Sequence, residues 1–448
     1  MPAVLEAPTK RASIFSPGHN LRRLFKRPGG QEPVIDGVRA LAILWVLALH
    51  LVFLHLTVFP ARAGAVFNAP LTSWTANGLF GVDMFFVISG FLIGSILFRE
   101  YRTEGTLLVG RFYVRRFLRL IPVYAAAMLL ALLFLKKLPP FWAPGNAVNA
   151  WANLLYVNNF LSTPNQFMPW CWSLAIEEQF YVLLPACILL MMGLRKRRIA
   201  VFLALMVFSV VLRYVVLRHA SITFPFNDAP YSAGWYRRFD IEYDKIWMRF
   251  GGLLAGVTGA YLNCFFVPQL RSFFARGRLV TTLATGSLLI VLASAFIDTG
   301  SRSILRLPHV VRQFWLAASH DIFSVAIMFL IFVGMYSRSG IGTMLQRVLS
   351  WKGFYPIAQL SYSAYLTHEM IFQWLFPQIG PNLALYFGPA RAMAIDSVVG
   401  LASTGILSCG LYLFIEQPCM QLRSHPAVLR VIRFFSGVRT HMAAAEAR

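Results

Sequence analysis

The sequence predicts an all-α, polytopic membrane protein, a transmembrane bundle of about ten helices. Of its 448 residues, 58% are hydrophobic and 13% are charged, whereas soluble domains average about 45–50% apolar and about 25% charged residues. The mean hydropathy is +0.61, and the apolar residues gather in runs near the roughly 20 residues that cross about 30 Å of hydrocarbon. Both observations indicate that lipid surrounds most of the chain.

The apolar runs give the order of the expected helices. Read with a window of about 19 residues, they predict spans at residues 36–58, 79–98, 121–138, 173–193, 199–217, 246–265, 280–297, 321–336, 356–377 and 394–416. The polar, basic start and the length of the first apolar run do not fit a cleaved secretory signal. We expect a basic cytoplasmic segment at 1–34, a transmembrane domain at 35–418 and a basic cytoplasmic tail at 419–448.

Basic residues orient the bundle. If the N-terminus is cytoplasmic, the segments on that side hold 27 Lys and Arg residues and those on the other side hold 11. The RKRR run from Arg195 to Arg198 is the plainest single anchor. The positive-inside rule therefore predicts that both termini are cytoplasmic. Topology and anionic lipid headgroups also explain the net charge of +23, so we expect membrane lipids and no nucleic acid as partners.

The five cysteines predict neither a disulfide framework nor a metal site. No two of them form a CxxC pair, and their number is odd. We expect small buried residues in helices, and no metal. The five are Cys171, Cys187, Cys264, Cys409 and Cys419.

The first expected helix carries ionisable residues, which are costly inside a membrane and suggest a functional site. Its stretch IDGVRALAILWVLALHL contains Asp36, Arg39 and His50. At about 100° per residue, Arg39 and His50 lie three turns plus about 20° apart and share one helix face. A rise of about 16 Å puts His50 near mid-membrane. We expect His50 to face a polar cavity; a structural, buried histidine is the alternative.

Three further expected helices carry ionisable residues. In GVDMFFVISGFLIG, Asp83 lies near the outer end, where a carboxylate can simply cap the helix. In WCWSLAIEEQFYVLLP, Glu177 and Glu178 are about 100° apart, so at most one points straight into a central cavity. In SYSAYLTHEM, His368 and Glu369 lie deep in the expected span.

Four arginines crowd RFYVRRFLRLIP, which we expect to be a cytoplasmic loop before the third helix. Helical spacing puts Arg116 and Arg119 on one side and Arg111 and Arg115 on another. Arginine forks match phosphate oxygens with paired hydrogen bonds. The stretch either anchors the protein to lipid headgroups or binds a cytosolic polyphosphate, such as the nucleotide of coenzyme A.

Six stretches together resemble the membrane acyltransferase-three family. They follow the family's order from residue 34 to residue 418, which makes them specific for the family although each alone is weak. Two positions depart from the pattern: Cys171 sits between two tryptophans, and Thr367 replaces the usual aromatic residue before His368. We find no appended esterase-like domain. The stretches are IDGVRALAILWVLALH, GVDMFFVISGFLIG, RFYVRRFLRLIP, WCWSLAIEEQFYVLLP, LSYSAYLTHE and FIEQP.

The resemblance implies an acyl-CoA-dependent O-acyltransferase in a bacterial cytoplasmic (inner) membrane, with 35–418 as the acyltransferase domain. Members of the family move an acyl group, often acetyl, from cytoplasmic acyl-CoA to a hydroxyl of a glycan, lipid-linked sugar or small molecule. A transporter or flippase of a polar lipid or sugar is the rival, because intramembrane charges also suit transport. Against it, the sequence shows no internal repeat and no matching pair of Gly/Pro-broken helices.

The family's motifs assign roles to particular residues. The basic-residue-then-histidine motif falls on Arg39 and His50, and His50 would act as general base, since its unperturbed pKa is close to working pH. Glu178 or Asp83 would orient it or line the acceptor site. A covalent acyl-histidine is the alternative route.

The remaining roles implied by the resemblance concern the two substrates. The double-arginine motif falls on Arg116 and Arg119, which would hold the CoA phosphates with help from Arg111 and Arg115. The sequence leaves the acceptor itself open. Residues expected at the acceptor site or in support of the base are Asp36, Asp83, Ser173, Glu177 and His368.

Overall fold

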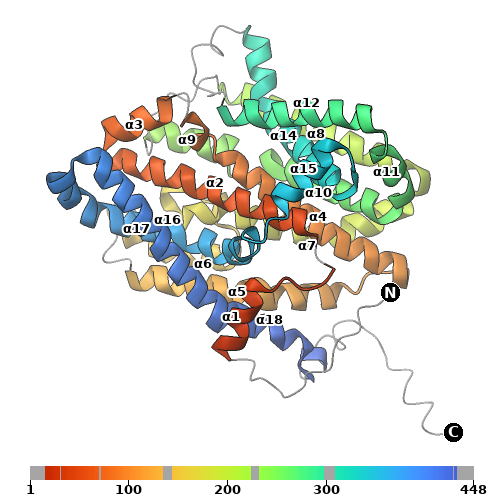
Figure 1. The fold of residues 1–448 in the computed structure, drawn as a ribbon, viewed down its shortest axis with the longest axis horizontal. Coiled ribbons are helices and arrows are strands. Elements are labelled where there is room, and N and C mark those ends of the chain that lie inside the picture. Colours follow the sequence, from red (N-terminus) through yellow and green to blue (C-terminus); the bar gives the residue numbers. More distant parts are fainter. Residues whose placement is uncertain are drawn as a thin grey trace.

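The computed structural model is all-helical over the residues that it describes, which are 16–30, 32–69, 72–134, 144–222, 232–296, 308–426 and 428–430. The expected tail therefore lies outside these residues from 431 onward. The long helices form one bundle with short helices at its edges (Figure 1). The ten long helices are α2 (Pro33–Val58), α4 (Leu79–Glu104), α5 (Val109–Phe134), α7 (Trp172–Gly193), α8 (Arg198–His219), α10 (Ile246–Phe265), α12 (Gly277–Phe296), α14 (His309–Tyr336), α16 (Phe354–Phe387) and α17 (Pro389–Leu411).

Shorter helices connect the long ones. They are α1 (Pro17–Phe25), α3 (Pro60–Asn68), α6 (Ala150–Leu154), α9 (Ala233–Glu242), α11 (Val267–Phe274), α15 (Gly340–Leu349) and α18 (Gln417–Gln421). A π-helical turn, Tyr412–Glu416, joins α17 to α18.

The predicted fold class is confirmed, and within the described residues each of the ten predicted spans overlaps one long helix. Within the described residues, eight helices are long and apolar enough to cross a membrane, or nine if α10 and α11, bent by 101°, form one span. One boundary was wrong. The arginine-rich stretch is not a loop, because α5 begins at Val109 and places all four arginines in its first turns.

The centre of the bundle is built on close backbone approach between α4 and α10. A Cβ on Gly90 would lie 2.1 Å from the carbonyl oxygen of Leu253, and one on Gly256 would lie 2.1 Å from that of Val87. Small residues allow such contact, which stabilises helix pairs in lipid by van der Waals packing. Helix α14 packs on both, whereas α8 lies at the edge with most of its surface exposed.

Helices α2 and α16 lie side by side although most of the chain separates them. Their apolar faces share one core cluster, in which Ile43, Val46 and Leu47 of α2 join Phe372 and Phe376 of α16. This pairing brings polar residues of the two helices face to face at mid-length.

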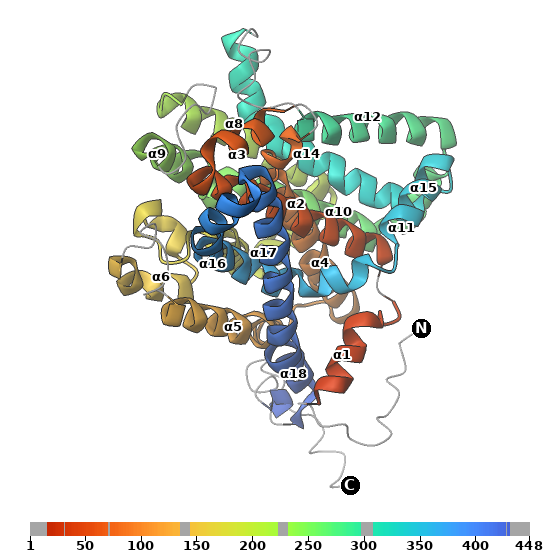
Figure 2. The same ribbon diagram turned by 60° about the vertical axis from the view of Figure 1, so that its left-hand side comes forward.

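The first and last described helices meet at one end of the bundle, where α1 lies beside α18 (Figure 2). The Asn20 side-chain amide donates to the carbonyl oxygen of Leu413, and Gln421 donates to the Asn20 side-chain oxygen. The two described ends of the chain are thus on the same side of the bundle.

Buried amides fix the start of α7, the helix that carries both adjacent glutamates. Gln179 of α7 donates to Asn159 at 2.7 Å, and Asn159 in turn donates to the backbone oxygen of Asp244. The Asp244 carboxylate accepts from Gln166 and pairs with Lys245 at 2.7 Å. Because buried polar groups are costly unless hydrogen-bonded, this network holds the segment before α7 against the segment before α10.

Candidate functional site

His50 occupies the inner face of α2, turned toward α16. Its Nδ1 lies 2.9 Å from the carbonyl oxygen of Val46, one turn earlier. Because a carbonyl only accepts hydrogen bonds, Nδ1 carries the proton and Nε2 is left as an acceptor. The side chain is 22% exposed, so Nε2 is not sealed in the core.

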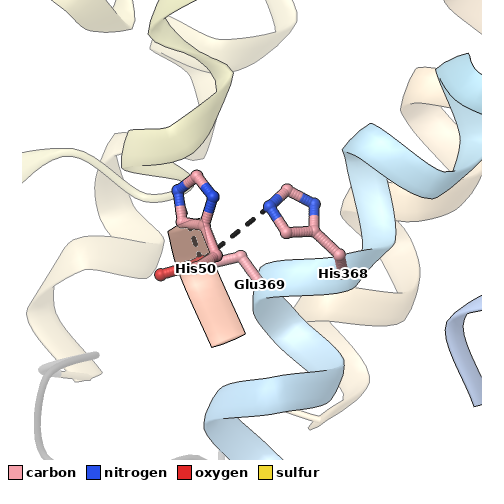
Figure 3. A group of neighbouring side chains, drawn as sticks. All are labelled: His50, His368 and Glu369. Atoms are coloured by element: carbon pink, nitrogen blue, oxygen red, sulfur yellow. Dashed lines mark ion pairs between the residues drawn. The ribbon is translucent and has the colours of Figure 1, made fainter. Parts of the chain in front are cut away.

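His368 and Glu369 of α16 complete a three-residue group with His50 (Figure 3). Nδ1 of His368 lies 2.9 Å from the carbonyl oxygen of Tyr365, which assigns it the same tautomer as His50. The Glu369 Oε2 lies 3.7 Å from Nε2 of His50 and 3.9 Å from Nε2 of His368. Gln373 donates to the other carboxylate oxygen at 2.9 Å.

This histidine–glutamate group is short of hydrogen-bond donors. Two imidazole nitrogens and one carboxylate oxygen converge, and all three are acceptors in these states. Nε2 of His368 and Oε2 of Glu369 are buried, with no hydrogen-bond partner among the described residues. Since unpaired buried polar atoms are costly, the group is suited to receive a proton. A metal ion is the other possible occupant, because the three ligand atoms lie within 4.8 Å of one another.

A cavity of about 90 Å³ opens beside the first half of α2, between α4, α5, α7 and α16. Arg39 of α2 and both Arg116 and Arg119 of α5 line it, together with Glu177 and Glu178 of α7. The side formed by α4 is largely apolar, with Val82, Phe85, Ile88, Leu92 and Ile93, and serine and tyrosine side chains complete the wall. His50 is not among the lining residues. The cavity therefore brings cationic groups, of which Arg39 lies on the same helix as His50, together with an apolar wall on α4.

The arginines predicted to act together differ in their surroundings. Arg116 forms a two-pronged ion pair with Glu178, with its Nη2 at 2.8 Å and Nε at 3.0 Å from Oε1, and its guanidinium stacks 3.4 Å from the Tyr181 ring centroid. Arg39 and Arg119 have no ion-pair partner within 4.0 Å in the described part of the chain. They are the cavity's available cations, and Glu178 contacts Arg116 rather than His50.

Arg111 and Arg115 lie outside the cavity lining, and Arg115 is exposed. Arg423, after α18, adds to the positive charge near α5. Burial, and then the neighbouring Arg119 and Arg115, lower its pKa to about 10, so it stays charged at neutral pH. Sequence reasoning did not single out Arg423.

The other glutamate of the pair and Ser173 both line the cavity. Oε2 of Glu177 accepts from Ser89 at 2.7 Å and from Tyr181 at 3.0 Å. The Ser173 hydroxyl lies 2.5 Å from the hydroxyl of Tyr365. These bonds fix the first turns of α7 against α4 and α16.

Two predicted site residues form ion pairs away from His50. Asp83 pairs with Arg249 at 2.9 Å and with His320 at 2.6 Å, in a cluster between α4, α10 and α14. Asp36 pairs with Arg27 at 2.7 Å, beyond the start of α2. Neither carboxylate contacts His50.

Two carboxylates near the site had been missed as candidates. Glu369 was noted in the sequence only for its depth. Glu416 lies in the π-helical turn, accepts from Ser363 at 3.2 Å, and interacts electrostatically with Arg119 and Arg39. It belongs to the FIEQP stretch, so the motif was the available signal.

Comparison with known proteins gives a consistent picture. The family described as "Acyltransferase domain" matches residues 32–413. The peptidoglycan O-acetyltransferase OatA of Listeria monocytogenes is 34% identical over 171 residues, which is 35% of this chain and 24% of that protein. OatA of Staphylococcus aureus is 34% identical over 176 residues, 37% of this chain and 26% of that protein. A putative O-acetyltransferase of Staphylococcus aureus is 32% identical over 179 residues, 37% and 26% of the two chains.

The matches thus span about a quarter of the length of these relatives. No solved structure matches the chain. None of these comparisons supports a transporter or flippase.

Proposed function

The chain belongs to the membrane acyltransferase-three family, and from that premise we propose that it transfers an acyl group, acetyl in the first instance, from cytoplasmic acyl-CoA to a hydroxyl group. The acceptor is a glycan, a lipid-linked sugar or a small molecule. The observation that carries the proposal is the layout of α2. Arg39 lines a cationic cavity near one end of this helix, and His50 joins a proton-accepting group farther along.

The relatives' names narrow the acceptor class. OatA of Listeria monocytogenes is named as an enzyme of peptidoglycan O-acetylation. For this chain we accordingly favour a carbohydrate hydroxyl over a small metabolite.

His50 is the proposed general base. An acceptor hydroxyl placed at Nε2 would attack the thioester carbonyl while its proton passes to Nε2. The C–S bond then breaks, and the CoA thiolate leaves with the electron pair and takes up a proton. Glu369 would stabilise the imidazolium formed in the transition state, as a carboxylate does for a catalytic histidine. In the alternative route the acyl group first moves to His50, forming an acyl-histidine, and then passes to the acceptor hydroxyl.

Arg39 and Arg119 are the proposed phosphate ligands, because their charge faces the cavity without an ion-pair partner among the described residues. Arg116 would act chiefly by holding Glu178 and the cavity wall. The apolar wall on α4 suits the pantetheine arm. Arg423 would add attraction for the nucleotide from outside the cavity.

We propose that a proton, and not a metal ion, occupies the histidine–glutamate group during turnover. Ligands of a tetrahedral zinc ion at about 2.0–2.1 Å stand roughly 3.4 Å apart. The carboxylate-to-imidazole distances here are 3.7 and 3.9 Å. These distances are too long for a direct hydrogen bond, and they leave room for a hydroxyl between the carboxylate and the imidazoles.

The proposed setting is a bacterial inner membrane with both termini in the cytoplasm. The excess of basic residues on one side and the meeting of α1 with α18 support it. In a cysteine-free background, Lys196→Cys should resist an impermeant thiol reagent in intact cells and react after permeabilisation. Labelling in intact cells would show that the orientation is the reverse of the one proposed.

The activity is tested with purified protein in lipid nanodiscs and acetyl-CoA labelled in the acetyl group. Acceptors are peptidoglycan fragments, a lipid-linked sugar and simple glycosides, and the readouts are free CoA thiol and label in alkali-labile ester. We expect both with at least one carbohydrate acceptor, and no labelled ester when labelled acetate plus CoA replaces acetyl-CoA. Folded protein that produces neither from any acceptor contradicts the proposal.

A further inference from the structure

Tyr365 connects the cavity to the histidine–glutamate group. Tyr365 lines the cavity, and its ring centroid lies 5.7 Å from that of His368, three residues later on α16. His50, His368 and Glu369 do not line the cavity. A thioester that enters from the arginine side therefore meets Tyr365 at the end of the cavity nearest to His368.

The Tyr365 side chain is held firmly at this end of the cavity. Its hydroxyl donates to the carbonyl oxygen of Trp170 at 2.8 Å and lies 2.5 Å from the Ser173 hydroxyl. Its ring meets Phe85 of α4 edge-on at 6.3 Å. Only 7% of the residue is exposed. Three different segments thus hold the ring in place, which favours a fixed wall over a freely moving side chain.

We propose that Tyr365, held by Ser173 and Trp170, narrows the histidine end of the donor cavity and limits the donor to short acyl chains. This inference rests on the proposed function. With the thioester carbonyl brought to His50, each further carbon of the acyl chain needs space beside the carbonyl. The Tyr365 ring occupies that space, and moving it would break two buried hydrogen bonds.

Tyr362 provides a matched control. It lies one turn earlier on the same helix, lines the same cavity, and its hydroxyl donates to the carbonyl oxygen of Leu120 at 3.1 Å. Its position is farther from His368 along α16. Removing its ring enlarges the cavity without opening the histidine end.

The test uses S-ethyl-, S-butyl- and S-octyl-CoA, thioethers that bind without reacting, and measures their dissociation constants by calorimetry in nanodiscs. One misfitting methylene commonly costs about tenfold or more, so wild type should prefer S-ethyl- over S-octyl-CoA by at least about that factor. Tyr365→Ala should abolish this preference. Tyr362→Ala keeps the wall and should retain the preference. Tyr365→Phe keeps the ring but loses both hydrogen bonds, so it should weaken the preference less than Tyr365→Ala does.

The outcomes separate the two proposals. Failure of CoA and all three thioethers to bind the wild type would contradict the donor site itself, and with it the proposed function. Binding without chain-length preference, or a preference that survives in folded Tyr365→Ala, would contradict only the role of Tyr365. If Tyr365→Ala does not fold, Tyr365→Leu takes its place, with the same loss of preference expected.

Discussion

Two clusters inside this bundle combine similar residue types but differ in their role. The histidine–glutamate group joins His50 to His368 and Glu369 between α2 and α16, at carboxylate-to-nitrogen distances of 3.7 and 3.9 Å. The second, which we call the Asp83 cluster, joins Asp83 to Arg249 and His320 at 2.9 and 2.6 Å. Both are buried, and each holds a histidine beside a carboxylate.

The clusters differ in how well their carboxylate is paired: both oxygens of Asp83 are hydrogen-bonded, although Nε of Arg249 has no partner among the described residues. Arg249 supplies a positive charge to Asp83 and stacks 4.5 Å from the Tyr243 ring centroid. The histidine–glutamate group has no arginine, and two of its buried acceptors lack partners among the described residues. A matched network fixes helices in place, whereas an unmatched one carries a cost that a substrate can relieve. We infer structure from the first and chemistry from the second.

The largest effect is expected from a substitution that breaks the Asp83 cluster. Asp83→Ala leaves the Arg249 charge buried and unpaired, and removing one partner of a buried pair commonly costs about 3–5 kcal/mol. We expect a strong loss of thermal stability in detergent, together with a loss of folded yield. Asp36→Ala, which removes a carboxylate whose partner Arg27 is 20% exposed, is the control and should cost clearly less stability. Equal stability of Asp83→Ala and wild type would remove the structural role.

Glu369→Gln tests the other cluster, the histidine–glutamate group. The amide keeps the shape but loses the negative charge that would stabilise the His50 imidazolium. We expect kcat to fall by about ten- to a hundredfold, the effect of losing one nearby opposite charge, with thermal stability unchanged. A variant that is unstable but fully active when folded would assign Glu369 to structure.

Arg119→Ala should act on donor binding alone. Losing one charged hydrogen bond commonly costs about 1.5–3 kcal/mol, so KM for acetyl-CoA should rise about tenfold or more while kcat changes little. Arg115, exposed on the same helix, is the matched control, and Arg115→Ala should leave KM unchanged. If both variants behave alike, the arginines serve the membrane surface and the donor site lies elsewhere.

The smallest expected effect is that of chelation. Because we place a proton in the histidine–glutamate group, dialysis against EDTA should leave the transfer rate unchanged. A rate that is lost on dialysis and restored by zinc would make His50, His368 and Glu369 metal ligands instead.

Much of this fold was within reach of the sequence, because hydropathy alone locates helices in lipid. The helical register also put Arg39 and His50 on one face. What the sequence could not supply is pairing between distant helices. Asp83 looked like a partner for His50, yet its partner Arg249 lies 166 residues away. Glu369 joins His50 only because α16 packs on α2.

The arginine pair shows a second limit of sequence reasoning. Arg116 and Arg119 share a motif and a helix side, so the pattern predicts one shared role. The structure gives Arg116 a two-pronged bond to Glu178 and leaves Arg119 without an ion pair among the described residues. Whether a charge is free for a ligand depends on what faces it, and only packing decides that.

The most direct test of the account is the turnover of labelled acetyl-CoA by His50→Ala beside wild type, at saturating donor and with an acceptor that the wild type uses. Removing a general base commonly lowers the rate about 10²–10⁴-fold. We predict a loss in kcat of that size, with unchanged thermal stability and unchanged affinity for S-ethyl-CoA. Transfer at the wild-type rate by folded His50→Ala protein would contradict the central claim that this histidine performs the chemistry.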